Sequence, residues 1–588
     1  MARNKYDIDE KLESEFSFKH FKKSMKYVRK YRGKMLFALL MSLLASVASL
    51  LGPMMTQHVL DVSVPNKDIR EVLFVALLYI LSVALIIVLS TIRSRTMNKV
   101  GQGIIFDMRQ DLFDHLQKLP FSYYDDRPHG KILVRVVQYI NNVSDMLSNG
   151  IITFIMEIIN LVIIGAFMFL VDSRLAWFVL AGLPVLTAVI FIIKPQQRRA
   201  WQDVSNKNSN MNAYLHESIN GVKITQIFTR QDKNYGIFAT QCENVRHAWM
   251  RTVYVGNLVG FSVTNISRII VSLIYIGGML WISPAVTFGT IMAMTSYSQS
   301  FWQPISSLAN IYNNFINTIA YLERIFETLD EPVKIADAPD AVELPPIRGD
   351  VEFRNVVFSY DESKTVLDNV SFTVKAGESV ALVGPTGAGK STIVNLLSRF
   401  YDLNSGQILV DGYDISKVTL HSLRSQMGIM LQDSFIFSGT VDYNIRYGKQ
   451  DATEEEIEAA AQAVHVSEFV KEMKDGYQTE LNERGSRLSQ GQKQLLSFAR
   501  TLISDPRILV LDEATSSIDT KTEVYVQEGI ARLLEGRTSF IIAHRLSTIR
   551  GCDKIMYIDN KNIVEAGTHQ ELMDKKGAYY ALYTARSR

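Results

Sequence analysis

The sequence predicts a two-part chain: an α-helical polytopic membrane domain, with six transmembrane helices and long cytoplasmic extensions, fused to an α/β P-loop domain. Two observations lead to this prediction. Six apolar segments, each near the ~20 residues that cross a bilayer core, fill the first half. In the second half, a glycine-rich octapeptide stands between a short apolar strand and a helix, as in a phosphate-binding loop.

Length and composition agree with a chain of several domains that is partly embedded in a membrane. The 588 residues exceed the ~100–200 of a typical domain, and the mean hydropathy is +0.06. A net charge of +2, from 62 basic and 60 acidic residues, gives no reason to expect nucleic acid as a partner. Cys242 and Cys552 lie in different halves and predict reduced thiols rather than disulfides or a metal site.

Residues 1–34 are polar and then basic, with interleaved aromatic residues. By the positive-inside rule, this charge places the N-terminus in the cytoplasm. Two interpretations stay open for the segment: a helix that lies on the anionic inner leaflet, and a solvated tail. Acidic residues near the start argue against an organellar transit peptide, and the length of the first apolar segment argues against a cleaved signal peptide.

The connections between the six apolar segments alternate in length. Those at 61–71, 172–174 and 283–285 are short and predict outer loops. Those at 93–149 and 195–254 are long and basic and predict cytoplasmic loops. We therefore expect a multi-pass protein of the plasma membrane with both termini in the cytoplasm. The spans are expected at about 35–60, 72–92, 150–171, 175–194, 255–282 and 286–308.

Helical spacing continues into both long connections, so they predict helical extensions of the spans rather than coil. Their tips are expected near 121–128 and 212–221. Four prolines after the last span mark a linker. The predicted organisation is an N-terminal cytoplasmic or interfacial segment (1–34), a transmembrane domain (35–329), a linker (330–348) and a nucleotide-binding domain (349–588).

The predicted phosphate-binding loop runs Gly384-Pro385-Thr386-Gly387-Ala388-Gly389-Lys390-Ser391, with Thr392 continuing into the helix. Its glycines let backbone N–H groups turn inward around phosphate oxygens, and the helix N-terminus adds partial positive charge. Lys390 is expected to reach the β- and γ-phosphates, and the Ser391 hydroxyl to bind Mg²⁺. ATP and Mg²⁺ are therefore the expected cofactors.

A second element of the site is the run from Arg507 to Asp512, whose residues 508–511 are apolar and are followed by two adjacent carboxylates. Asp512 is suited to hold the Mg²⁺ shell, because that ion prefers hard oxygen ligands. Glu513 could act as general base toward the attacking water. The alternative, two acids in a solvated turn, fits poorly after an all-apolar strand in a P-loop protein.

These motifs give the C-terminal region a family resemblance. Residues 349–588 resemble the nucleotide-binding domain of ABC transporters, and the whole chain resembles a bacterial ABC exporter half-transporter of the type IV, multidrug-exporter-like class. The segment Leu488–Gln492 resembles the family signature LSGGQ with one departure, at Gln490. The resemblance implies that Ser489 and Gly491, together with Gln490 and Gln492 of the same motif, act on ATP held by the opposite subunit.

The resemblance assigns further roles residue by residue. Tyr360 is similar to the aromatic that stacks on adenine, and Gln432 to the residue that senses Mg²⁺. Asp519 is similar to the D-loop aspartate, and His544 to the switch histidine at the γ-phosphate. The loop tips, best placed at Tyr123–Asp126 and Tyr214–Glu217, would be coupling helices that seat on the nucleotide-binding domains, the second one on the opposite subunit.

The function implied is ATP-driven export of a hydrophobic or amphipathic compound (drug-like, lipid or peptide) by alternating access. Alternatives are a lipid flippase, a membrane-tethered P-loop ATPase, and a gated channel or regulatory subunit. A membrane tether needs only one or two spans, so six spans argue against a tethered ATPase. The presence of both Glu513 and His544 favours ATP hydrolysis over a role in gating alone. The expected partner is a second half-transporter. We favour a heterodimer because Gln490 stands beside intact catalytic residues, and a homodimer stays open.

Membrane-embedded residues give two weaker hypotheses. Tyr297, Phe301, Trp302 and Tyr312 could line a substrate cavity or could pack against other helices. Glu157 and Arg268, which stand in apolar sequence, could face the central cavity, also as a pair, or could snorkel toward the inner interface.

Overall fold

The computed structural model describes residues 18–125, 127, 129–281, 286–360, 365–430, 434–512, 520–543 and 546–586. The chain divides into two compact units. The membrane unit comprises the residues up to Gln117 and those from Pro128 to Glu331. The nucleotide unit comprises Lys118–Arg127 and the residues from Pro332 onward.

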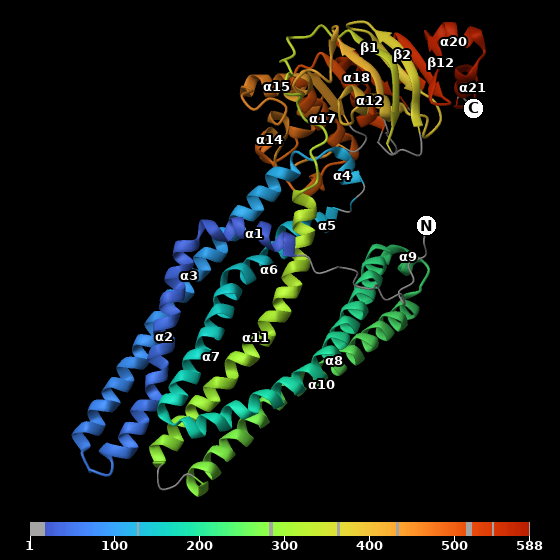
Figure 1. Cartoon of the computed structure of the whole chain (residues 1–588). Coiled ribbons are helices and arrows are strands. Elements are labelled where there is room, and N and C mark those ends of the chain that lie inside the picture. The colour runs from blue at the N-terminus through green and yellow to red at the C-terminus, as the bar shows by residue number, and fades with distance from the viewer. Residues whose placement is uncertain are drawn as a thin grey trace. The chain divides into compact units, whose positions relative to one another are not determined.

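The membrane unit is entirely helical in its described part (Figure 1). Five of its helical segments are long and apolar enough to cross a membrane: Arg32–Ser63, Ile69–Leu116, Ile132–Val171, Ser173–Asn220 and Gln231–Leu280. The bounds are α1 Phe18–Lys30, α2 Arg32–His58, η1 Val59–Ser63, α3 Ile69–Leu116, α5 His129–Val134, η2 Arg135–Tyr139, α6 Ile140–Asp145, η3 Met146–Gly150, α7 Ile151–Val171, α8 Ser173–Asn220, α9 Val222–Ile227, α10 Gln231–Ile276, η4 Gly277–Trp281 and α11 Phe288–Leu329.

The long connections are helical, as the apolar spacing predicts. The helices α3 and α8 each have 48 residues, which at 1.5 Å per residue is ~72 Å, more than twice the ~30 Å of a bilayer core. The sixth predicted span lies at the start of α11, which has 42 residues but is not among the five segments that meet the apolar criterion. Its lower hydropathy comes from serine, glutamine and asparagine side chains.

The outer turn between α7 and α8 consists of Asp172 alone. Its carboxylate accepts hydrogen bonds from the backbone N–H groups of Arg174, at 2.8 Å, and Leu175, at 3.1 Å. This N-cap satisfies donors at the start of α8 that have no partner inside the helix.

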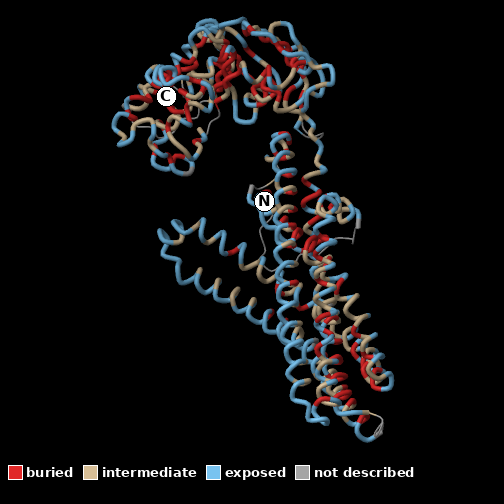
Figure 2. Tube along the Cα trace, turned by 90° about the vertical axis from the view of Figure 1, so that its left-hand side faces the viewer, coloured by how far each residue is buried: buried red, intermediate tan, exposed pale blue. Residues whose placement is uncertain are grey.

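The apolar surface of the spans is mostly exposed. Between 11% and 28% of each apolar window is buried. In Figure 2 the long helices are pale blue along much of their length, and buried residues gather where helices pack together. Helices that face lipid are expected to expose such side chains.

A buried cluster joins α7, α8, α10 and α11, and it corrects one sequence hypothesis. Tyr297, Phe301 and Trp302 are 0–2% exposed and pack in this cluster, so they do not line a cavity. The Tyr297 hydroxyl donates to the Leu50 carbonyl at 2.6 Å. Tyr312, by contrast, is 48% exposed. Aromatic residues at helical spacing predicted a face of α11, but the spacing could not tell packing from cavity lining.

The helix α1 docks on the rest of the membrane unit, so residues 18–30 are not a solvated tail. Lys26 pairs with Asp111 at 3.0 Å and Lys30 with Asp107 at 2.6 Å, both acids on α3. Lys23 pairs with Asp330 just beyond α11. An interfacial position for α1 stays a prediction.

The nucleotide unit contains two main sheets. A six-stranded sheet has the order β12-β11-β3-β10-β9-β6, and a four-stranded antiparallel sheet has the order β2-β1-β4-β5. The strands are β1 Val351–Ser359, β2 Thr365–Val374, β3 Ser379–Val383, β4 Ser405–Val410, β5 Tyr413–Asp414, β6 Met427–Met430, β7 Gly439–Thr440, β8 Glu480–Leu481, β9 Ile508–Asp512, β10 Thr538–Ile542, β11 Lys554–Asp559 and β12 Asn562–Gly567. The helices are α4 Phe121–Asp125, α12 Lys390–Leu397, α13 Leu420–Arg424, α14 Val441–Arg446, α15 Glu454–Ala463, α16 Val466–Val470, α17 Gln490–Ile503, α18 Thr520–Leu534, α19 Leu546–Arg550, α20 His569–Lys575 and α21 Ala578–Arg586.

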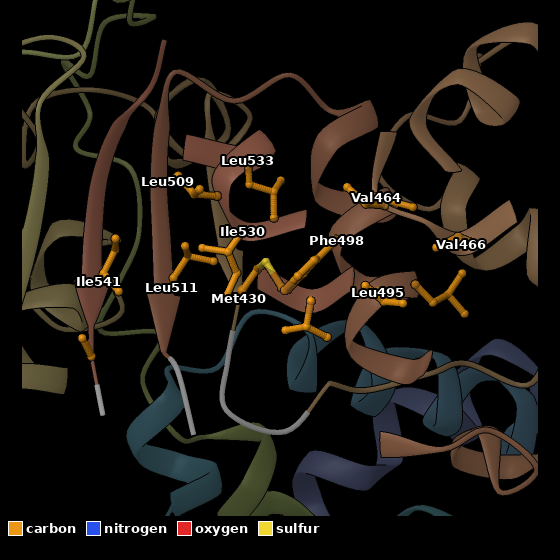
Figure 3. Close-up of a cluster of buried hydrophobic side chains, with 14 of the residues drawn as sticks. Met430, Val464, Val466, Leu495, Phe498, Leu509, Leu511, Ile530, Leu533 and Ile541 are labelled. Carbon is orange, nitrogen blue, oxygen red and sulfur yellow. The ribbon is translucent and has the colours of Figure 1, made fainter. Parts of the chain in front are cut away.

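Successive side chains of the central strands point to opposite faces of the six-stranded sheet. On β3, Val380 and Leu382 join a core with α12 and the antiparallel sheet. Ala381 and Val383 join a second core with α17 and α18. Figure 3 shows part of this second core, where Phe498 of α17 lies beside Met430 of β6, and Leu495 lies toward Val464 and Val466. The helices α12 and α17 therefore cover opposite faces of the sheet.

Candidate nucleotide-binding site

The predicted phosphate-binding loop joins the end of β3 to the start of α12, and its backbone requires glycine at two close approaches. Gly384 has φ +147°, and a Cβ there would lie 2.1 Å from the Ile558 carbonyl oxygen. Gly389 has φ +104°, and its Cβ would lie 2.9 Å from Leu367. Gly387 has φ +82° with open space around it. The positive φ values turn backbone N–H groups toward one side of the loop, which suits a phosphate.

Two charges favour an anion at this loop. The Lys390 ammonium group donates to the carbonyl oxygens of Gly384, at 3.0 Å, and Pro385, at 2.8 Å. It thus lies over the loop, where it can reach phosphate oxygens. The N-terminus of α12, which begins at Lys390, adds partial positive charge. The other predicted loop residues, Thr386, Ala388, Ser391 and Thr392, lie between or directly after these groups.

Tyr360 lies beside the same helix. Its hydroxyl is 3.1 Å from the Thr392 hydroxyl, and its ring packs edge-on against Tyr401 with centroids 5.1 Å apart. The residue is 50% exposed, so ring surface is available for stacking on a base.

Asp512 leaves the sheet at the same edge as the loop. It is the last residue of β9 and is in register with Ile542 of β10, which in turn is in register with Leu382 of β3. Leu382 stands two residues before the loop. The Asp512 carboxylate and the Ser391 hydroxyl are hard oxygen donors of the kind that Mg²⁺ prefers, so this donor set fits the ion.

The signature segment begins α17. Ser489 is the N-cap, and its Oγ accepts a hydrogen bond from the Gln492 N–H at 3.2 Å. The Gln492 side chain accepts in return from the Ser489 N–H at 2.9 Å, which completes a capping box. Ser489 and Gln490 are exposed at the helix N-terminus, whereas Gly491 is buried. The Ser489 hydroxyl proton can therefore donate to an anion beside a helix end that favours negative charge.

Four predicted site residues, Gln432, Glu513, Asp519 and His544, lie outside the described part of the chain. Their roles stay predictions. In the sequence, Gln432 comes two residues after the end of β6, and Glu513 comes directly after β9.

The two halves of the predicted ATP site lie on different sides of one nucleotide unit. The loop helix α12 packs in the core between the two sheets, and the signature helix α17 packs on the other face of the six-stranded sheet. The sheet therefore separates the signature from the phosphate-binding loop of the same chain. A site that uses both requires a second nucleotide unit.

The first loop tip packs with the nucleotide unit through contacts that the sequence did not predict. The helix α4 covers Phe121–Asp125, so it includes most of the predicted segment, whose last residue lies outside the described part. The Asp125 carboxylate accepts a hydrogen bond from the Tyr401 hydroxyl at 2.6 Å. The Phe121 ring lies 4.9 Å from the Phe400 ring.

The second loop tip lies further along the chain than Tyr214–Glu217, so that placement was wrong. Those residues lie inside α8, and Tyr214 is buried, with its hydroxyl donating to the Asn234 carbonyl at 3.3 Å. The helix ends at Asn220, Gly221 is its C-cap, and α9 forms the tip. Figure 1 shows α8 and α10 as a hairpin closed by α9. Exposed apolar residues gather at this tip: Ile219, Val222, Ile224, Ile227 and Phe228.

Comparisons with known proteins agree with both units. A family model described as the ABC transporter transmembrane region matches residues 35–305, and one described as ABC transporter matches residues 367–516. An uncharacterized ABC transporter ATP-binding protein of Bacillus subtilis, YknV, is 39% identical over 100% of this chain and 98% of its own. A fatty acid ABC transporter ATP-binding/permease protein of Mycobacterium bovis is 37% identical over 88% of this chain and 81% of its own. The structure of a bacterial Atm1-family ABC exporter with ATP bound has a TM-score of 0.80 and 29% identity, covering 95% of this chain and 99% of that one.

Proposed function

Because this chain belongs to the ABC transporter family and is a multi-pass half-transporter of the exporter type, we propose that it couples ATP hydrolysis to export of an amphipathic compound across the bacterial plasma membrane. The observation that supports this most directly is one chain that joins a phosphate-binding loop to a membrane unit of long helices. The spans argue against a merely tethered ATPase.

The chain's own residues supply the binding chemistry. The loop N–H groups and Lys390 hold the β- and γ-phosphates, and Tyr360 stacks on the adenine. Ser391, Asp512 and Gln432 would hold Mg²⁺, which supplies neutralising charge at the phosphates when bound. Glu513 takes a proton from water as its oxygen attacks the γ-phosphorus and the bond to ADP breaks. His544 donates to the γ-phosphate.

A second chain completes each ATP site. Ser489 and the N-terminus of α17 contact the γ-phosphate held by the opposite nucleotide unit, so that two units close head to tail on two ATP molecules. ATP favours this closed state over the open one, which is a population shift.

The loop tips would pass closure to the membrane unit. The contacts of α4 with Tyr401 and Phe400 tie the first tip to the chain's own nucleotide unit. The exposed apolar residues of α9 would seat on the partner's unit, since nothing in the described chain covers them.

The partner is a second half-transporter, and we propose a heterodimer, with the homodimer as the other outcome. Gln490 beside an intact Glu513 is the combination expected of a chain that lends an altered signature to a partner. Purification of this chain alone tests the point: a stable dimer with full ATPase activity would exclude the heterodimer.

Export is tested by ATP-dependent uptake into inside-out vesicles, with Glu513→Gln as the control that binds ATP without turnover. If the chain is an exporter, wild-type vesicles take up the compound in the presence of ATP, and Glu513→Gln vesicles do not. Flux that needs ATP binding but survives Glu513→Gln would instead support a gated channel. Hydrolysis without any uptake, across a panel of compounds, would support a tethered ATPase.

A further inference from the structure

The helix α11 exposes polar residues in two stretches, 296–303 and 310–317. These residues recur at intervals of three, four or seven residues, which places them on one side of the helix, its polar face. The opposite side holds the buried Tyr297, Phe301 and Trp302. The exposed polar residues are Ser296, Gln299, Ser300, Gln303, Asn310, Asn314 and Asn317.

Part of this polar face lies at the depth of the hydrocarbon core. The helix begins at Phe288, and ~20 residues cross the core, so Gln299 and Gln303 fall inside it. Ser296 and Ser300 donate to carbonyls of their own helix, at 3.1 and 3.0 Å. The amides of Gln299 and Gln303 make no hydrogen bond to any described residue. Amides without partners are costly in lipid, so this face needs water or a polar ligand.

The neighbouring helix α10 carries one charge near mid-depth. Arg268 stands twelve residues before Leu280, which at 1.5 Å per residue is ~18 Å into a ~30 Å core. It is exposed and, within the described part of the chain, forms no ion pair, including none with Glu157. Asn257, Thr264 and Ser272 share its side of the helix and are exposed.

The spanning stretches of these two helices carry charge of one sign, although acids stand beside them: Asp61 accepts a hydrogen bond from the Gly289 N–H at 2.8 Å, and Glu157 lies in α7. Residues 255–281 and 288–317 contain no Asp or Glu. Lys194 of α8 adds a second positive charge beside α11, with its ammonium group 3.7 Å from the centroid of the Tyr312 ring. That aromatic ring is therefore already covered by a cation. Arg268 and Lys194 would therefore repel a positively charged substrate and attract a negatively charged one.

We propose that Arg268 binds the anionic headgroup of an amphiphilic substrate, and that the polar face of α11 carries this headgroup across the membrane. The proposal rests on the export function and narrows its substrate class. A guanidinium group pairs with a carboxylate or a phosphate through two parallel hydrogen bonds. As the headgroup moves along α11, it forms hydrogen bonds with one hydroxyl or amide group of the helix after another. Leu258, Phe261 and Ile269, 46%, 68% and 60% exposed, offer apolar surface to the acyl chain.

The test uses the full transporter in nanodiscs of neutral lipid and four probes of one chain length. These are a fatty acid, an alkyl phosphate, an alkyl alcohol and an alkyltrimethylammonium. We expect the two anions to stimulate the ATPase and the alcohol and ammonium to fail. Arg268→Gln should raise the half-maximal anion concentration by about tenfold with basal ATPase unchanged, and Arg268→Lys should raise it less. A preference between the two anions identifies the headgroup as a carboxylate or a phosphate.

Arg251→Gln is the matched control, because Arg251 is exposed on the same helix outside the predicted span. Equal loss of anion stimulation in Arg251→Gln and Arg268→Gln would overturn the assignment to Arg268. Stimulation by the ammonium probe, or anion stimulation that survives Arg268→Gln unchanged, would overturn the proposed substrate class. Absence of any basal ATPase in the wild-type transporter would contradict the export function instead.

Discussion

Replacing Tyr401 by Phe is expected to lower the free energy that holds α4 on the rest of the nucleotide unit by ~1 kcal/mol. The Tyr401 hydroxyl donates to the Asp125 carboxylate at 2.6 Å, and a hydrogen bond to a charged group is worth ~1.5–3 kcal/mol. We assign this hydrogen bond a smaller contribution than that range because Asp125 is exposed to water. The ring contact between Phe121 and Phe400, worth ~0.5–1.5 kcal/mol, stays in place. The population of undocked α4 should therefore rise about fivefold.

Hydrogen exchange at residues 121–125 measures this population, and the ratio of transport to ATP hydrolysis measures its consequence. Tyr401→Phe should speed exchange about fivefold and lower the transport ratio, with basal hydrolysis retained. Asp125→Asn and the double variant complete a double-mutant cycle. If Tyr401→Phe leaves exchange unchanged, or if the two single effects simply add in the double variant, the hydrogen bond does not hold α4 in place.

Three further predictions concern the ATP site. Glu513→Gln should bind ATP but hydrolyse it at least ~100-fold more slowly, because water loses its base; wild-type turnover at matched purity would contradict the assignment. Gly384→Ala should abolish nucleotide binding in a fluorescent-ATP assay, since its Cβ would lie 2.1 Å from the Ile558 oxygen, and unchanged affinity would show that the loop tolerates the clash. Tyr360→Ala should weaken ATP binding by ~0.5–1.5 kcal/mol of lost stacking, with Tyr360→Phe as the control that keeps the ring; equal loss in both would exclude stacking.

The phosphate-binding loop could be predicted from the sequence because its determinants are contiguous. Strand, glycines and helix all lie within residues 379–397, and local geometry requires each of them. The helical extensions were predictable for the same reason, since apolar spacing continues through them.

Contacts between distant segments could not be predicted. Asp125 and Tyr401 stand 276 positions apart, and neither carries a motif that points to the other. The tip of the second loop was misplaced because helical spacing continues past Tyr214, and Gly221 was not recognised as the end of α8. Helical spacing on α11 likewise identified a face of aromatic residues without showing which neighbours cover it.

The placement of α12 and α17 on opposite faces of one sheet has a consequence for the cell. A newly inserted chain carries every predicted element of an ATP site, but its own sheet stands between the loop and the signature. If the signature acts across two subunits, as we propose, hydrolysis is expected to begin only when two chains meet in the membrane. On this proposal, unassembled copies consume no ATP. A surplus of this chain would then not drain the energy supply, and the activity would follow the number of assembled transporters.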